Sequence, residues 1–435
     1  MKGFAAEQPN SELSLSEIET VTKNTLAAYT TAKRVLLIHP DYSRHDYSHV
    51  LVPCIYRLLA EGSLERLDTL NAGGTHRPMS EVEILTKLGL IGGGFPKLGT
   101  CFNHEFDNSS QLYEPAEIPA SFVREKTRGH LDIPLPVTVN KLLRDNYDLI
   151  IAVSGTVPHE AVGYSGGTKI FFPGISGPEV IGFFHWAAVL IGIPDIIGCL
   201  DNAAREVVDE GTKHIFNSIP NTPVLSFNMV YQEDDSRRVL AKGLYTGEGL
   251  SGFSAALKQA AALSSRLHIR YLDEEKSVIV QCLPEMYDEV WTAGKGSYKL
   301  QKPGVLAPGG EIILFAPHIH CFHSNSAMER EIREIGYHGR DYVVDFCKKN
   351  PKFNKNVASH VINVRGLGSM IDGKEQFPFK VTLATQIPET DCAKVGLGYR
   401  NPESLRKEDF RGPGKLWIPD GGQWLYVRRS STLVI

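Results

Sequence analysis

The sequence contains few cysteines, and they follow no pattern that would put them to structural use. Its seven cysteines are widely scattered, and none forms a Cys-x-x-Cys pair. An odd and dispersed set supports neither a disulfide framework nor a structural zinc site. The N-terminal segment also lacks the apolar stretch of a signal peptide, so we expect a cytoplasmic protein.

Long blocks of one charge and uninterrupted apolar runs are missing as well. The net charge is −4 and no long Lys/Arg block occurs, which argues against nucleic acid as the main partner. One stretch, 180–200, approaches the length of a membrane span, but it contains His185, Pro194 and Asp195. We therefore expect a buried helix followed by a turn there, and no membrane partner.

What the chain does contain is the composition of a soluble globular protein. Hydrophobic residues make up 42% of the sequence and charged residues 22%. At 435 residues the chain is too long for one ordinary hydrophobic core, so we expect at least two domains. The 15 histidines are a generous number, and imidazole both moves protons near neutral pH and binds metals.

Short apolar runs that look like buried strands alternate with helical patterns, which is typical of an α/β fold. Ser80 and Glu83 form a capping box at the start of one predicted helix. The predicted strands lie at Arg34–His39, Leu67–Ala72, Asp148–Val153, Pro223–Val230, Ser277–Cys282, Glu311–Pro317 and Phe379–Ala384, and further helices lie at His49–Gly62 and Ala327–Gly336.

A polar stretch, 271–277, separates the two series of strands, and we place a domain boundary near residue 272. The predicted fold class is α/β, with residues 1–272 as an N-terminal catalytic and cofactor-binding domain and residues 273–435 as a C-terminal domain. Ligands of open α/β sheets bind beyond the carboxyl ends of the strands, and two-domain chains commonly place them between the domains. We therefore expect the active site in the interdomain cleft.

The segment 163–177 is the richest in chemical signals. It holds five glycines, one proline and a single lysine, Lys169, and His159 and His185 lie on either side of it. Beside the apolar residues 170–172 the lysine would be partly desolvated, which favours the reactive free amine. The segment therefore predicts a cofactor cradle with an attachment lysine. A Gly-rich surface loop with a solvated lysine is the alternative, and spacing alone does not choose between them.

Other candidates follow predicted strands or lie between glycines. Arg77 could bind a substrate carboxylate or form a salt bridge that holds its loop. His104 becomes interesting only if it converges with other histidines. Lys295, between two glycines, is either a substrate-facing cation or a surface lysine. His318 and His320 project to the same face of an extended segment, where we favour pocket lining over metal binding.

Taken in order, these blocks resemble the lactate racemase family, whose enzymes use a nickel-pincer nucleotide. The resemblance covers nearly the whole chain. It rests on DYSR followed by Pro53, GTHRP, the NHE histidine, H-x4-YSGGTK-x3-PGISG with a later histidine, and AGKG. It implies two α/β domains with the cofactor in the cleft between them. The cluster 318–323 departs from the pattern and puts lactate itself in doubt as the substrate.

The resemblance also implies a role for each matching residue. The cofactor, pyridinium-3,5-bisthiocarboxylate mononucleotide, would be tethered through a thioamide to Lys169 in the Gly-rich cradle. Its nickel would be bound by His185, and the acid/base pair would be His104 and His159. The cradle residues are Gly166, Gly167 and Thr168, and the substrate-contacting residues are Arg77 and Lys295.

The implied chemistry is reasonable for a 2-hydroxy acid. Its α-hydrogen is barely acidic, and removal as hydride to a pyridinium acceptor avoids a carbanion. The hydroxyl proton must leave at the same time, and imidazole is a suitable base; reaction from either enantiomer calls for two such bases. Nickel suits soft sulfur with imidazole. We therefore predict an isomerase, a racemase or epimerase of a small-molecule 2-hydroxy acid, with cofactor-biosynthesis proteins as further partners.

Two rival hypotheses remain at this point. The first is a hydrolase in which His104, His159 and His185 bind zinc directly, with Glu105 or Glu160 as the base. The second is a protein that binds a nickel or nucleotide cofactor and performs no turnover.

Overall fold

The computed structural model describes residues 3–429 apart from 235 and 237, and the chain folds into two compact units. The first unit contains residues up to 181 together with 200–267, and the second contains residues 182–199 and the chain from 268 onward. The boundary near residue 272 stays a prediction. The structure adds that 182–199 groups with the later part of the chain, which it enters within helix α5 (Pro178–Ile191).

The first unit is built on a mostly parallel sheet. Strands β10, β7, β2, β3 and β4 pair in parallel, whereas β11 and β1 are added antiparallel at one edge. Strand β2 is buried along almost its whole length, as expected where helices cover both faces of a parallel sheet. Among the described residues the order is β1 (Ala5–Glu7), β11 (Val239–Glu248), β10 (Val224–Glu233), β7 (Leu149–Gly155), β2 (Arg34–His39), β3 (Arg66–Asn71) and β4 (Leu98–Asn103).

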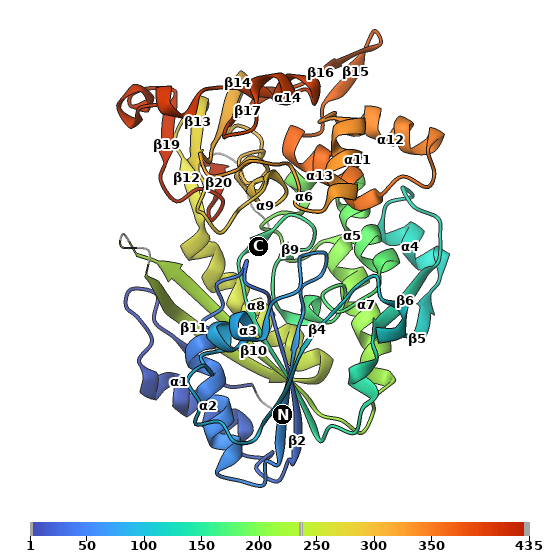
Figure 1. The fold of residues 1–435 in the computed structure, drawn as a ribbon, viewed down its shortest axis with the longest axis vertical. Coiled ribbons are helices and arrows are strands. Elements are labelled where there is room, and N and C mark those ends of the chain that lie inside the picture. The colour runs from blue at the N-terminus through green and yellow to red at the C-terminus, as the bar shows by residue number, and fades with distance from the viewer. Residues whose placement is uncertain (1–2, 235, 237, 430–435) are drawn as a thin grey trace. The chain divides into compact units, whose positions relative to one another are not determined.

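Helices and two small ribbons complete the first unit. Helices α1 and α2 lie together on one flank of the sheet, and α7 lies with the β5–β6 ribbon on the opposite flank (Figure 1). The helices are α1 (Leu15–Leu26), α2 (Ser48–Ala60), α3 (Glu81–Leu88), α4 (Ala120–Lys126), α7 (Ala203–Asn217) and α8 (Gly249–His268), and the ribbons pair β5 (Leu112–Ile118) with β6 (Leu135–Asn140) and β8 (Pro158–His159) with β9 (Gly163–Tyr164). Short 3₁₀-helices span Ser109–Gln111, Lys141–Arg144 and Gly167–Ile170.

The second unit contains a separate parallel sheet with its own core. Its order in the described residues is β18 (Gly398–Tyr399), β17 (Phe379–Ala384), β14 (Leu306–Phe315), β13 (Lys276–Cys282) and β19 (Lys415–Ile418). Smaller pairs join β12 (Ile269–Leu272) with β20 (Leu425–Arg428) and β15 (Ser369–Ile371) with β16 (Lys374–Gln376). Its helices are α6 (Ile193–Ile196), α9 (Val290–Ala293), α10 (Lys295–Tyr298), α11 (Ser326–Ile335), α12 (Arg340–Lys349), α13 (Lys355–Arg365) and α14 (Glu389–Lys394), with 3₁₀-helices at Pro402–Ser404 and Lys407–Phe410. The predicted α/β class is confirmed for both units.

Several local predictions are confirmed. The strands at Arg34–His39 and Phe379–Ala384 have the expected bounds, and α3 begins after the Ser80–Glu83 capping box. The apolar stretch 180–200 forms α5 and then the short α6. Among the residues that the structure describes, no helix combines the length and the apolar character that a membrane span requires.

Candidate active site

The carboxyl ends of four neighbouring parallel strands position most of the candidate residues. Strands β7, β2, β3 and β4 pair in parallel, so the loops that follow them start from the same edge of the sheet. These loops carry DYSR after β2, GTHRP after β3, His104 after β4 and His159 after β7. The sheet thus gathers four motifs that are far apart in the sequence, where ligands of such sheets bind.

The loops after β2 and β3 are joined by a histidine–carboxylate pair. Nδ1 of His76 donates to Oδ2 of Asp41 at 2.6 Å, and the amide of Ser43 donates to the other carboxylate oxygen at 2.7 Å. Burial by itself would raise the pKa of Asp41, but His76 and Arg44 outweigh it and hold the pKa well below its usual range. A buried carboxylate that stays ionised fixes the ring orientation of His76 and would stabilise its imidazolium form.

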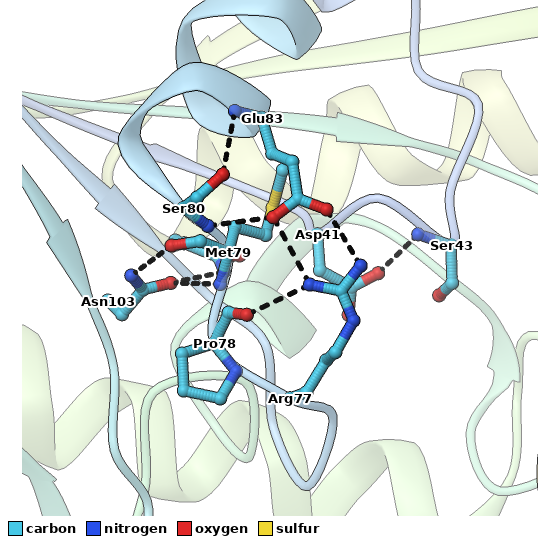
Figure 2. Close-up of polar contacts among 9 residues, drawn as sticks. Asp41, Ser43, Arg77, Pro78, Met79, Ser80, Glu83 and Asn103 are labelled. Carbon is cyan, nitrogen blue, oxygen red and sulfur yellow. Dashed lines mark hydrogen bonds and ion pairs between the residues drawn. The ribbon is translucent and has the colours of Figure 1, made fainter. Parts of the chain in front are cut away.

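The GTHRP loop is anchored from β4 (Figure 2). The side chain of Asn103 accepts from the Met79 amide at 2.9 Å and donates to the Met79 carbonyl at 2.7 Å. The next turn is the capping box, in which the Ser80 amide donates to Glu83 at 2.8 Å. These contacts hold the end of the loop that follows His76.

Arg77 forms a salt bridge with Glu83 that holds its loop, the alternative to substrate binding. Its guanidinium donates to both carboxylate oxygens of Glu83, at 2.7 and 3.2 Å, and to the Pro78 carbonyl at 3.1 Å (Figure 2). It also lies over the ring of Tyr42, 4.4 Å from the centroid. These contacts hold the loop, and the substrate-binding role of Arg77 stays a prediction.

The glycine run is a buried turn and not a surface loop. The backbone of Gly166 and Gly167 has φ values of 84° and 62°, which glycine adopts readily. A Cβ at Gly166 would lie 2.7 Å from the Thr156 hydroxyl, and one at Gly167 would lie 2.9 Å from Leu257. The surface-loop alternative is therefore wrong, because the run is packed against both the sheet and α8.

Lys169 extends from this turn into an electrostatically mixed environment. Burial lowers the pKa of its ammonium to about 8, with further lowering by Arg44 and Arg205, while Glu160 and Asp41 act in the opposite direction. Since the ordinary value is near 10.5, a much larger fraction of the amine is unprotonated near neutral pH than in an ordinary lysine. The predicted partial desolvation is thus present. Two residues of the DYSR loop, Asp41 and Arg44, act on the charge of Lys169.

His159 is buried in the β8–β9 hairpin. The Ala161 amide donates to its Nδ1 at 3.1 Å, and a carboxylate oxygen of Glu160 lies 3.3 Å from the same nitrogen. Glu160 also acts on the charge of Lys169. The arrangement therefore places an imidazole, a carboxylate and the lysine in the same part of the first unit.

His104 is held as a neutral, structural imidazole. It is 5% exposed, its Nε2 donates to the Ser176 carbonyl at 2.9 Å, and its Nδ1 accepts from Asn140 at 3.1 Å. Burial is the main cause that lowers its pKa to about 4. Both ring nitrogens are engaged by the protein, which disfavours the predicted proton transfer at this residue.

His185 lies in the second unit, on α5, as the apolar pattern predicted. Its Nδ1 donates to the side-chain oxygen of Asn356 on α13, at 3.0 Å. The lone pair of this tautomer lies on Nε2, and a hydrogen-bond acceptor of this kind commonly orients a metal-binding imidazole. Asn356 lies 171 residues further along the chain, so no local sequence signal could have identified it.

The second unit also contains a cluster of aromatic and imidazole rings centred on Trp291 and His360. The Trp291 ring is 4.8 Å from that of His323 and 4.5 Å from that of His360. Burial lowers the pKa of His360 to about 3, and the charges of His323 and His185 add to this effect. The hydroxyl of Tyr337 is hydrogen-bonded to His360 Nε2 at 2.9 Å.

The remaining candidates of the second unit lie at short helices and turns. Lys295 begins α10, and its Nζ lies 4.4 Å from the centre of the Tyr287 ring. His318 donates from Nε2 to the Tyr287 carbonyl at 3.0 Å, whereas His320 is exposed. The expectation that these two histidines share one face of a strand is wrong, because β14 ends at Phe315 and the chain turns there.

Metal binding by side chains alone is not indicated. Among the described residues, no group of three or more His, Cys, Asp and Glu side chains is arranged to hold a metal ion. The zinc hypothesis with His104, His159 and His185 therefore gains no support from a ligand set.

The pairing of His76 with Asp41 and the effect of Arg44 on the Asp41 charge were not predicted, although all three residues lie in motifs that the sequence singles out. The pair could not be recognised from either motif alone, because Asp41 and His76 are 35 residues apart in the sequence. They meet because β2 and β3 are adjacent strands. The position of Arg205 near Lys169 could not be predicted, because Arg205 lies in a helical sequence without any recognisable motif.

The chain is similar to known proteins in sequence and in fold. The family model of the lactate racemase N-terminal domain matches residues 14–192. No curated protein matches the chain. The crystal structure of a Thermotoga maritima protein matches with 47% identity and a TM-score of 0.92, covering 98% of this chain and 100% of that one.

A more distant structure has the same fold. The lactate racemase apoprotein from Thermoanaerobacterium thermosaccharolyticum matches with 17% identity and a TM-score of 0.65, covering 98% of this chain and 95% of that one. At that identity the likeness concerns the fold alone. Through residues 14–192, the chain belongs to the lactate racemase N-terminal domain family.

Proposed function

We propose that the protein is a racemase or epimerase that inverts C2 of a 2-hydroxy acid. The observation that carries the proposal is Lys169, an amine of lowered pKa in a buried glycine turn near the Asp41–His76 pair. The match of residues 14–192 to the lactate racemase N-terminal domain family supports the reaction class. The substrate itself, whether lactate or a larger 2-hydroxy acid, is left to experiment.

The residues present fit the nickel-pincer nucleotide that the family implies. Lys169 would carry the group covalently, on a turn whose glycines let the backbone pack closely against Thr156 and Leu257. Cofactor contacts by Gly166, Gly167 and Thr168 stay a prediction. His185, oriented by Asn356, offers one imidazole nitrogen for nickel. When bound, this cofactor supplies the hydride acceptor that inversion at a weakly acidic carbon requires.

Proton transfer needs two imidazoles, one for each enantiomer. His159 fits one role, since its Nδ1 is held by the Ala161 amide and the nearby Glu160 carboxylate would stabilise the positive charge of the ring when Nε2 takes up a proton. For the second role the sequence resemblance implies His104, but the geometry favours His76, whose Nδ1 is held by ionised Asp41. His104 then supports the C-terminal end of the Gly-rich segment 163–177 through the Ser176 carbonyl.

Substrate binding calls for a cation that can hold a carboxylate. Arg77 is the residue that the resemblance implies, and its present ion pair with Glu83 would have to be exchanged for the substrate. Arg44 is the second candidate, because its positive charge lowers the pKa of both Lys169 and Asp41 and therefore lies close to them. Lys295 of the second unit is the further cation that the resemblance implies.

The proposal is tested on protein produced together with the enzymes that make the cofactor. Denaturing mass spectrometry should find an adduct on the Lys169 peptide, and Lys169→Arg should abolish both the adduct and the interconversion of enantiomers. A panel of chiral 2-hydroxy acids identifies the substrate. A cofactor-loaded, active Lys169→Arg protein would overturn the proposal.

The same experiment separates the two rivals. An unmodified chain that carries zinc would favour the hydrolase. An adduct without turnover of any substrate in the panel would favour a cofactor-binding protein. Partner proteins that deliver the cofactor stay a prediction, which co-purification from the cofactor-producing host would check.

A further inference from the structure

Arg205, near the start of α7, is a buried cation that the proposed reaction does not use. It is 5% exposed, whereas arginine is almost never buried without partners. Its guanidinium donates to the Tyr164 carbonyl and, at 3.4 Å, to the hydroxyl of Thr168. Both acceptors belong to the glycine turn that leads into Lys169.

Two further residues of α7 contact the same turn. Asp209 accepts from the Thr168 hydroxyl at 2.6 Å, and the Thr212 hydroxyl lies 3.4 Å from the Thr168 carbonyl. Positions 205, 209 and 212 are spaced by four and three residues, so they share one face of the helix. The Thr168 hydroxyl thereby bridges the guanidinium and the carboxylate, and one helical face holds the residue that precedes Lys169.

The sheet holds the turn from the other side. The side-chain oxygen of Asn228, on β10, accepts from the Gly167 amide at 2.9 Å and from the Ser154 hydroxyl at 2.6 Å. Two successive residues before Lys169 are therefore fixed by opposite elements. The backbone that carries the amine is more constrained than its glycine content suggests.

Charge around Lys169 is contributed from several elements. Arg44 from the β2 loop and Arg205 from α7 disfavour the ammonium, and they add to the larger effect of burial. Glu160 from the β8–β9 hairpin and Asp41 from the β2 loop favour it. Arg205 is thus the α7 contribution to a balance that leaves the pKa of Lys169 near 8.

We propose that Arg205 is a positioning residue for Lys169, which holds the turn from Tyr164 to Thr168 and adds a buried positive charge to the surroundings of the amine. Arg205 then favours the neutral nucleophile while keeping its backbone in one conformation. The inference rests on the proposed function only in that Lys169 would carry the cofactor. The property that Arg205 changes is the reactivity of the unmodified Lys169 amine.

The test therefore uses the full-length chain made without cofactor. Limiting acetic anhydride acetylates neutral amines: the lysine nitrogen bonds to a carbonyl carbon, acetate leaves, and the amine loses its proton. Labelling of Lys169 is measured by peptide mass spectrometry across a pH series, relative to exposed Lys258. In Arg205→Met we expect the midpoint of the Lys169 profile to rise by about one pH unit. Hydrogen exchange in the segment 163–171 should also become faster.

Two further variants and a matched control separate charge from anchoring. Thr168→Val should accelerate hydrogen exchange and leave the midpoint of Lys169 labelling unchanged. Arg205→Lys should also keep this midpoint and accelerate exchange, because a single ammonium lacks the planar fork of donors with which arginine reaches both the Tyr164 carbonyl and the Thr168 hydroxyl. Lys213→Met removes an exposed cation from the same helix and should change neither measurement.

The outcomes are decisive in either direction. A folded Arg205→Met protein with the wild-type midpoint and wild-type exchange overturns the proposal. If Arg205→Met does not fold, unchanged exchange in Arg205→Lys overturns it instead. Because no cofactor is present, failure of the racemase proposal would leave these results unaffected.

Discussion

His76 and His104 follow neighbouring strands of one sheet, yet the two imidazoles have opposite environments. The side chain of His76 is 16% exposed and bonded to a carboxylate, Asp41. His104 is almost fully buried, and its two nitrogens are bonded to the Asn140 amide and the Ser176 carbonyl. Neither difference is visible in the sequence, where His76 comes after a predicted strand and His104 after a Gly-rich segment.

The comparison shows that partners, and not the place after a strand, decide what a histidine can do. A proton carrier must be stable in both charge states, and a neighbouring carboxylate stabilises the charged one. The pKa of His104 is lowered to about 4, mainly by burial, so this ring stays neutral at pH 7. His76 therefore fits a catalytic role, and His104 fits a structural one.

The largest expected effect comes from His76→Ala. We expect turnover of the best 2-hydroxy acid to fall by about a hundredfold or more, which is the usual contribution of a general acid or base. The Lys169 adduct should remain, and its quantity in each preparation corrects the rate for cofactor loading. Full activity of a loaded His76→Ala protein would remove His76 from the mechanism and return the second role to His104.

Asp41→Asn should have a smaller effect on the same step. The amide keeps a similar shape but does not stabilise an imidazolium on His76, so we expect turnover to fall by about tenfold. The pH dependence of kcat should change together with the rate, whereas a purely structural role would lower the rate at all pH values alike. Glu81→Gln, an exposed change on the adjacent helix, is the matched control and should have no effect.

His104→Ala should act on stability more than on turnover. The Ser176 carbonyl and the Asn140 amide would each lose a buried partner, so we expect the free energy of unfolding to fall by about 1–3 kcal/mol. Urea unfolding measures this change, and turnover per folded, loaded molecule should stay within a few-fold of wild type. A fully stable variant without turnover would instead support the assignment of His104 that the sequence resemblance implies.

Apolar patterns made the buried strands predictable. Strand Arg34–His39 has the expected bounds because its four central residues are all apolar, and Phe379–Ala384 has them because apolar residues alternate with Lys380 and Thr382. Strand β11 was not predicted, since Lys242, Gly243 and Gly247 interrupt its apolar pattern and its antiparallel pairing with β10 supplies the stability.

The site was predictable where its residues are neighbours in sequence. The glycine turn and Lys169 form one segment, and the structure buries this segment, whereas its use as a cofactor cradle stays a prediction. The pairs Asp41–His76 and His185–Asn356 could not be predicted, because each depends on which elements the fold brings together. Arg77 illustrates the same limit, since only the structure shows its guanidinium bonded to Glu83.

The smallest expected effect is on the pH dependence of stability, and it tests the neutral state of His104 directly. The folded pKa of about 4 lies below the ordinary value of 6.5, so between these limits the unfolded chain binds a proton that the folded chain does not. Stability is therefore fully present above pH 6.5 and falls as the pH drops towards 4, by up to about 1.4 kcal/mol per pH unit for one such histidine. His104→Gln does not titrate and should make the fall shallower between pH 7 and pH 5, whereas His130→Gln, at an exposed position, should not. Equal slopes in urea unfolding for wild type and His104→Gln would mean that His104 takes up its proton in the folded protein, and the contrast with His76 would then lose its basis.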